Sequence, residues 1–142
     1  MDWKLELVVV PVSDVDRAKS FYMDKAGFDL HVDHRSGDDF RVVQLTPPGS
    51  ACSIAIMSGS GVTQAPPGSA QGLHLIVPDI DAARAELVER GADVGEIFHM
   101  GQTGQAPGPD PERRDYNSFL PFSDPDGNAW LVQEVKRTAP GA

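Results

Sequence analysis

Residues 72–91 read GLHLIVPDIDAARAELVERG and join a strand pattern to a helix pattern. In the first six residues, side chains alternate between two faces, the period of two that is typical of a strand. One face carries Leu73, Leu75 and Val77. The other face carries Gly72, His74 and Ile76. We therefore expect a half-buried strand that packs its first face under the helix that follows.

The helix is predicted to begin after Asp79, because aspartate is a good N-cap residue. Apolar residues then recur at helical spacing, which predicts one buried side. That side is made of Ile80, Ala83, Leu87 and Val88. Gly91 is expected to end the helix, since glycine adopts the left-handed conformation at the lowest cost.

The same pattern occurs earlier, in residues 7–18, which read LVVVPVSDVDRA. Corresponding pairs are Val12 and Val77, Asp14 and Asp79, Asp16 and Asp81, and Ala18 and Ala83. Gly27 ends the first helix as Gly91 ends the second. A repeat of nearly half the chain predicts two similar modules. We expect a first module at 1–57, a Ser-, Gly- and Pro-rich linker at 58–71, a second module at 72–136 and a flexible tail at 137–142.

Each module is expected to contain a strand, a helix and three further strands. In the first module the pattern predicts a strand at 5–12, a helix at 14–26 and strands at 28–33, 40–46 and 52–57. In the second module, the helix is followed by a strand near 93–99 and a long loop at 100–115. Then come a strand at 116–122, a tight turn at 123–128 and a strand at 129–135.

Composition narrows the class of protein. The 142 residues are enough for one domain with a proper core, and the formal net charge of -9 argues against binding to nucleic acid or to acidic membranes. Cys52 is the single cysteine, which excludes an internal disulfide. The N-terminal residues lack the pattern of a signal peptide and no apolar run could span a bilayer, so a cytoplasmic location is expected.

Several short motifs, taken in order, resemble the vicinal oxygen chelate superfamily, which includes glyoxalase I, bleomycin-resistance proteins and extradiol dioxygenases. They are Val-x-Asp-[Val/Ile]-Asp in both halves, Ser20-Phe21-Tyr22, and Asp124-Pro-Asp-Gly-Asn128 before the last strand. The resemblance implies an α+β fold of two tandem βαβββ modules, whose mixed sheet curls around a cavity. It also implies a homodimer.

The resemblance also locates four positions at which metal-binding members carry their ligands. Here these positions are Leu7, Ala55, Gly72 and Leu131, and none has a donor atom in its side chain. We therefore expect no metal and no other cofactor, and a shifted divalent-metal site is the less favoured alternative.

His74 and Gln133 are the main candidates for the site. Each lies two residues from an empty ligand position on a strand, so both should face the cavity. Histidine suits proton transfer near neutral pH, which makes His74 the candidate catalytic residue as well as a ligand contact. The alternatives are a structural histidine in the sheet and a polar glutamine near a strand end.

Three further residues are candidate ligand contacts. Arg41, in the middle of a strand, either reaches an anionic group or extends to solvent. Tyr116 follows the long loop, so we expect it at the mouth of the cavity under a mobile lid. Met57, at the end of its strand, completes the set.

Two functions from different classes follow. The first is metal-independent binding of a small organic molecule, as in the bleomycin-resistance branch, with sequestration as the mechanism. The alternative is a glyoxalase-like lyase, isomerase or ring-modifying enzyme in which His74 moves a proton. A metal-dependent enzyme ranks third.

Overall fold

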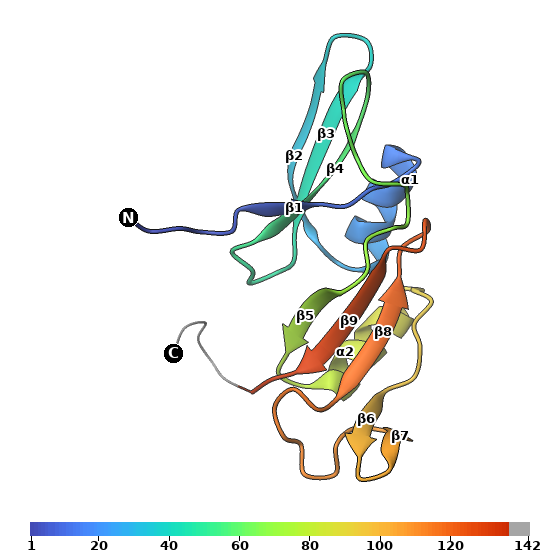
Figure 1. Ribbon diagram of the computed structural model, residues 1–142. Helices are drawn as coiled ribbons and strands as arrows, with labels where there is room; N and C mark the ends of the chain where they lie inside the picture. Colours follow the sequence, from blue (N-terminus) through green and yellow to red (C-terminus); the bar gives the residue numbers. More distant parts are fainter. Residues whose placement is uncertain (137–142) are drawn as a thin grey trace. The chain divides into compact units, whose positions relative to one another are not determined.

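A computed structural model describes residues 1–136 and shows two compact units (Figure 1). One unit comprises Met1–Ala70 together with the short segment Asp124–Asn128. The other comprises Gln71–Ser123 and the chain from Ala129 onward. The tail predicted at 137–142 lies outside the described residues. Each unit contains one mixed sheet and helical segments, which confirms the predicted α+β class with two modules.

The first unit follows the predicted order of elements. These are β1 (Leu7–Val9), α1 (Val15–Ser20), the π-helical turn η1 (Phe21–Lys25), β2 (Asp29–Ser36), β3 (Phe40–Thr46) and β4 (Ser53–Ser58). The sheet order is β1-β4-β3-β2, with β1 parallel to β4 and the other pairs antiparallel. The first strand is shorter than predicted, and the predicted helix at 14–26 changes to π-helical geometry from Phe21.

The second unit repeats this arrangement and adds one strand. Its elements are β5 (Leu73–Val77), α2 (Ile80–Glu89), β6 (Phe98–Gly101), β7 (Gly104–Pro107), β8 (Phe119–Ser123) and β9 (Ala129–Glu134). The sheet order is β5-β9-β8-β6-β7, again with the first strand parallel to the last. The extra strand β7 forms a hairpin with β6. The long loop predicted at 100–115 was therefore wrong for residues 100–101 and 104–107.

Both α-helices begin and end for the predicted reasons. The Asp14 carboxylate accepts a hydrogen bond from the Arg17 backbone N–H at 3.0 Å, and Asp79 accepts one from the Ala82 N–H at 3.2 Å. Glycines stop the two helical segments in the left-handed conformation, with φ of 77° at Gly27 and 83° at Gly91. The repeated motif therefore works through the same local physics in each unit.

In the second unit the helix covers one face of the sheet. Ile80 and Leu87 of α2 are buried. The sheet residues buried on this side include Leu120, Phe122, Trp130 and Val132. Trp130 stacks on Phe122 with ring centroids 5.8 Å apart. Val88 is 50 % exposed, so its predicted place on the buried side of the helix was wrong.

The turn between β8 and β9 belongs to the first unit and is tied to it by buried polar groups. The Tyr22 hydroxyl donates to the Asp124 carboxylate at 2.7 Å, and the Asn128 side-chain amide donates to the Pro11 carbonyl at 2.7 Å. The Ser13 hydroxyl donates to Asp126 at 2.6 Å. Because Tyr22 and Asn128 are fully buried, these bonds satisfy groups that water cannot reach.

No helix within residues 1–136 is long and apolar enough to cross a membrane.

Candidate functional site

The face of the second sheet opposite α2 is the candidate functional surface. Strand register and alternation place on it His74, Ile76, Phe98, Met100, Gln105, Pro107, Phe119, Pro121, Leu131 and Gln133. These side chains include no carboxylate, ammonium or guanidinium group. We call this set the open face. It is a mostly apolar surface with three polar positions, His74, Gln105 and Gln133, the composition expected of a small-molecule site.

His74 and Gln133 lie on neighbouring strands of the open face. His74 on β5 pairs with Leu131 on β9, and the next pair along the same two strands is Ile76 with Gln133. The two polar residues are thus diagonal neighbours across a strand pair, a separation that long side chains can bridge. His74 is exposed and Gln133 is half-buried. The structure brings the two together as the alternation predicts, while their contact with a ligand stays a prediction.

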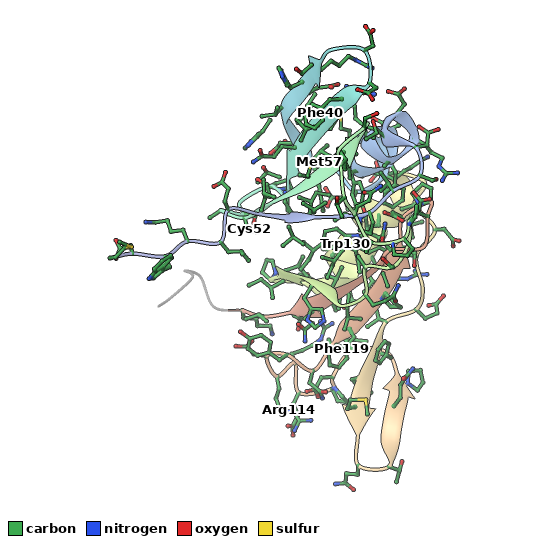
Figure 2. The ribbon with its side chains drawn as sticks, turned by 45° about the horizontal axis from the view of Figure 1, so that its top comes forward. Phe40, Cys52, Met57, Arg114, Phe119 and Trp130 are labelled. Atoms are coloured by element: carbon green, nitrogen blue, oxygen red, sulfur yellow. The ribbon has the colours of Figure 1, made fainter. Side chains whose placement is uncertain are left out.

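Two phenylalanines form an aromatic platform on the open face. Phe98 and Phe119 are paired across β6 and β8, and their rings stack with centroids 5.1 Å apart at an interplanar angle of 27°. Figure 2 labels Phe119 on β8. Large apolar neighbours are also exposed, with 47 % of Ile76 and 48 % of Met100 accessible. Sequence reasoning missed these residues, although extending the period of two through β8 identifies Phe119.

The segment 108–118 borders the second sheet and is held by a buried carboxylate. Asp110 is fully buried and accepts hydrogen bonds from the Arg114 side chain at 2.8 Å and the Asn117 amide at 3.1 Å. The Arg114 hydrogen bond is the main reason that the pKa of Asp110 is lowered. Asn117 in turn exchanges hydrogen bonds with the backbone of Met100. This network gives the segment a defined conformation, and the mobile lid expected from the sequence stays a prediction.

Tyr116 sits in this segment with a left-handed backbone, φ of 67°, and 46 % of its surface exposed. Its N–H donates to the Glu134 carbonyl at 2.9 Å, next to Gln133 in the chain. Arg113 is also left-handed, with φ of 53°, and its guanidinium binds the buried Glu134 carboxylate at 2.7 Å and pairs with Asp81. Left-handed non-glycine residues persist only where surrounding contacts hold them. Neither conformation can be read from the sequence.

The face of the first sheet opposite α1 carries the predicted contact Met57, which is labelled in Figure 2. Pairing and alternation place on that face Leu7, Val9, Val42, Gln44, Thr46, Ser53, Ala55 and Met57. The Thr46 hydroxyl contacts the Ser53 hydroxyl at 2.6 Å and the His31 ring at 3.1 Å. Met57 is half-buried, and its role as a ligand contact stays a prediction.

Arg41 lies on the other face of the first sheet, under α1, and only 6 % of it is exposed. Its guanidinium binds the Asp33 carboxylate through two bonds of 3.0 Å and Asp16 through one of 2.5 Å. These carboxylates raise the pKa of Arg41, with Asp33 the larger cause. The side chain therefore does not extend to solvent, which was one of the two predicted alternatives. Arg41 is not part of the open face, and its role as a ligand contact stays a prediction.

The four positions at which metal-binding members of the superfamily carry their ligands do not suit a metal in this chain. Leu7 and Ala55 lie on the first sheet and Leu131 on the second, with Gly72 just before β5, and none offers a ligand atom. Within residues 1–136, no group of three or more His, Cys, Asp and Glu side chains is arranged to hold a metal ion.

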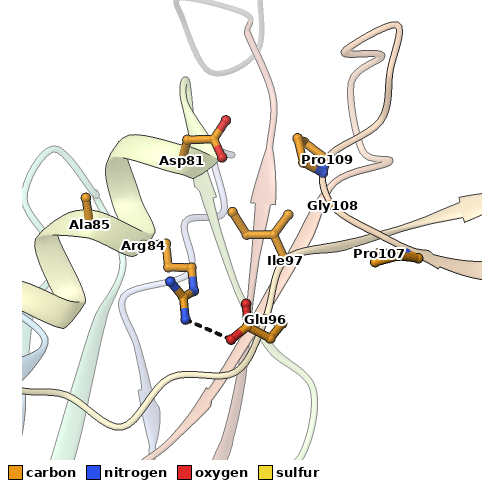
Figure 3. A pocket seen from close by; sticks show the side chains of 8 residues that line it. All are labelled: Asp81, Arg84, Ala85, Glu96, Ile97, Pro107, Gly108 and Pro109. Atoms are coloured by element: carbon orange, nitrogen blue, oxygen red, sulfur yellow. Dashed lines mark hydrogen bonds and ion pairs between the residues drawn. The ribbon is translucent and has the colours of Figure 1, made fainter.

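A hollow of about 420 Å³ lies beside α2 on the helix side of the second sheet (Figure 3). It is lined by Asp81, Arg84, Ala85, Glu96, Ile97, Pro107, Gly108 and Pro109. Arg84 donates to the Gly95 carbonyl and to Glu96, each at 3.1 Å, and Asp81 is paired with Arg113. Its charged groups are therefore engaged within the chain.

Comparisons with known proteins agree with this architecture. The family model of the Glyoxalase/Bleomycin resistance protein/Dioxygenase superfamily matches residues 4–132. The crystal structure of TnmS3, an antibiotic binding protein from Streptomyces sp. CB03234, is 34 % identical in sequence. The alignment covers 94 % of this chain and 96 % of that one, with a TM-score of 0.71.

Two further relatives are more distant. A superfamily member from Sphaerobacter thermophilus DSM 20745 is 29 % identical, with 94 % of this chain and 98 % of that one covered and a TM-score of 0.71. The uncharacterized protein YetH of Bacillus subtilis (strain 168) is 27 % identical over 133 residues, which are 89 % of this chain and 94 % of YetH.

Proposed function

Since the chain belongs to the Glyoxalase/Bleomycin resistance protein/Dioxygenase superfamily, we propose that it binds a small organic molecule on the open face of its second sheet, without a metal. The observation that carries this proposal is the chemistry of that face. It offers stacked phenylalanine rings and exposed aliphatic side chains, with a few polar side chains, among them His74 and Gln133, to fix orientation. Sequestration of the bound molecule is then the function.

The chemistry of the open face favours a neutral ligand with an aromatic part. A flat ring can stack on the Phe98 and Phe119 pair, which adds about 1 kcal/mol to the burial of apolar area. One hydroxyl or carbonyl group can then bond to His74 or Gln133. A cationic ligand has less support, because the open face offers it no carboxylate. The acidic residues that give the chain its net charge of -9 therefore lie outside the open face.

The similarity to TnmS3 supports binding as the function, because that protein is an antibiotic binding protein. Metal chemistry has no support from the donor set at Leu7, Ala55, Gly72 and Leu131. We also propose a homodimer, because resemblance to the superfamily implies one, and a cytoplasmic location.

Calorimetric titration of the purified chain with 2-naphthol tests the proposal. We expect saturable binding that survives treatment with EDTA. Phe119→Leu keeps an apolar side chain but removes the ring, so it should weaken binding about fivefold. Gln133→Leu should also weaken binding. Val88→Ala, on an exposed part of α2, is the matched control and should bind like the parent. Equal affinity in all four proteins would exclude the open face.

An enzymatic function remains the second candidate, because His74 is exposed on the same face and can reach a bound molecule. His74→Ala separates the two functions once a ligand is known. Loss of product formation with retained binding would assign proton transfer to His74. Binding without any turnover by the parent protein would leave sequestration as the function.

A further inference from the structure

A hollow of about 480 Å³ lies between the β6–β7 hairpin and the segment that follows β7. Its polar lining comes from His99 and Gln102 of the hairpin and from Asp110, Glu112 and Arg114 of the segment. None of these five side chains belongs to the open face or to the hollow of Figure 3. The volume lies within the range of about 300–1,000 Å³ that is typical of small-molecule sites. We call this site the hairpin hollow, and it is separate from both.

Arg114, which is labelled in Figure 2, is held in the hairpin hollow by a buried carboxylate. Its Nε donates to Asp110 Oδ2 at 2.8 Å and its Nη2 donates to Asp110 Oδ1 at 3.3 Å. Asp110 is fully buried, so it fixes the plane of the guanidinium. The Nη1 group takes part in neither bond and offers its N–H donors to a ligand from a position set in advance. The Glu112 carboxylate lies 3.5 Å from Arg114 Nε, which places an acceptor beside this donor.

His99 adds a second acceptor from the hairpin side. Its Nδ1 lies 2.8 Å from the Gly108 carbonyl oxygen. Because a carbonyl can only accept, Nδ1 carries the proton, and Nε2 of the neutral ring is then an acceptor. A Cβ atom added at Gly101 would lie 4.0 Å from Nε2, so this nitrogen is next to another residue that lines the hairpin hollow. The hollow therefore combines fixed donors and fixed acceptors.

We propose that the hairpin hollow binds a neutral polyhydroxylated molecule, of which a pyranose sugar is the simplest example. A hydroxyl group both donates and accepts, so one hydroxyl can accept from Arg114 Nη1 while it donates to the Glu112 carboxylate. A neighbouring hydroxyl can donate to His99 Nε2 and accept from the Gln102 amide. Pro111 supplies apolar surface for the C–H groups of the ring.

Charged ligands are less suitable for the hairpin hollow. An anion would meet the carboxylates of Asp110 and Glu112, and a cation would meet the Arg114 guanidinium that lies between them and the ligand's donors. Each of these charges already has a partner of opposite sign within the chain. The proposal concerns a second ligand, and it does not depend on binding at the open face.

Titration of the full chain with sugars, followed by ¹H–¹⁵N nuclear magnetic resonance, tests the proposal. The probes are methyl β-D-glucopyranoside, methyl β-D-galactopyranoside and methyl α-D-mannopyranoside. For at least one of them we expect saturable shifts of the amides of 99–102 and 110–114, with a Kd of about 1 mM for a ligand of this size. Acetate and methylammonium should give no saturable shift there. Absence of saturation with all three sugars, or tighter binding of acetate or methylammonium, would overturn the proposal.

Variants locate the sugar in the hairpin hollow. His99→Asn keeps an N–H donor for the Gly108 carbonyl and removes the acceptor at Nε2, so it should weaken sugar binding about tenfold. Glu112→Ala should weaken it about fivefold. Glu89→Ala, at an exposed glutamate that ends α2, is the matched control and should bind like the parent. Parent affinity in both His99→Asn and Glu112→Ala would overturn the site.

The ring nitrogens of His99 give a readout that a purely structural histidine would not change. Long-range ¹H–¹⁵N spectra of the free protein should show the proton on Nδ1. The Nε2 resonance should then shift as sugar binds, because this atom accepts a new hydrogen bond. A proton on Nε2 in the free protein, or an Nε2 resonance that stays in place at saturation, would overturn the proposal. All variants should keep the parent affinity for 2-naphthol, so the two ligand sites are tested separately.

Discussion

Gly68→Ala is expected to be one of the more destabilising small changes in this chain. Gly68 has a φ of 83°, and a Cβ atom at this position would lie 2.0 Å from the Asp126 carbonyl oxygen. The left-handed backbone alone costs an alanine about 1 kcal/mol. Relief of the clash must move the Asp124–Asn128 turn and weaken bonds such as those from Ser13 to Asp126, at about 1 kcal/mol each. We expect a total loss of about 3 kcal/mol in the free energy of unfolding.

Gly49→Ala is the matched control, because Gly49 has the same φ of 83° but no atom within 4 Å of the added Cβ. It should lose only the backbone cost of about 1 kcal/mol. For a chain of this size the two variants correspond to decreases in Tm of about 10 °C and about 3 °C. Urea unfolding followed by near-ultraviolet circular dichroism measures both. Equal losses would show that the packing of Gly68 against the turn contributes nothing, and would refute the reasoning.

Three further predictions concern buried polar contacts and acid stability. Tyr22→Phe should lower the free energy of unfolding by about 2 kcal/mol, because it removes a buried hydrogen bond to the Asp124 carboxylate. A change below about 0.5 kcal/mol in urea unfolding would contradict this prediction. Arg41→Met should cost about 2 kcal/mol in the same assay, since it leaves Asp33 without its main partner, and a more stable variant would show that the ion pair is a net cost. Hydrogen bonds from arginine are the main reason that the pKa values of Asp33 and Asp110 lie below the ordinary 3.8. The ionised carboxylates therefore stabilise the folded state above about pH 4, and this stabilisation is lost as the pH falls further. The urea midpoint should therefore drop steeply in acid, and it should drop less steeply in Asp110→Asn; parallel pH profiles for the two proteins would argue against this role of Asp110.

Much of the fold could be predicted because it depends on local rules that the sequence states twice. Asp14 and Asp79 cap the helices, and Gly27 and Gly91 stop them, through contacts between residues close in the chain. The hairpin of β6 and β7 was missed because its residues lack the apolar alternation of a buried strand. The pairing of β6 with β7 depends on backbone hydrogen bonds between largely exposed strands. The pattern of side chains does not predict such hydrogen bonds.

The candidate site could be predicted only where alternation decides the face of a residue. Period two placed His74 and Gln133 on the face opposite α2, and the strand register agrees. The same period could not predict that Arg41 binds Asp33 and Asp16, because its partners come from β2 and α1 and only the folded chain brings them near. The stacking of Phe98 on Phe119 is likewise a consequence of tertiary pairing.

The discontinuity of the first unit constrains the order of folding during synthesis. Residues 1–70 leave the ribosome well before residues 124–128, yet the fully buried Tyr22 hydroxyl and the Pro11 carbonyl find their partners in that later segment. In a nascent chain that ends at residue 70, the Tyr22 hydroxyl and the Pro11 carbonyl therefore lack these hydrogen-bond partners, which have not yet been synthesised. The first unit can therefore reach its final form only after residue 128 has been synthesised, and expressing residues 1–70 without residues 124–128 should yield an incomplete first unit.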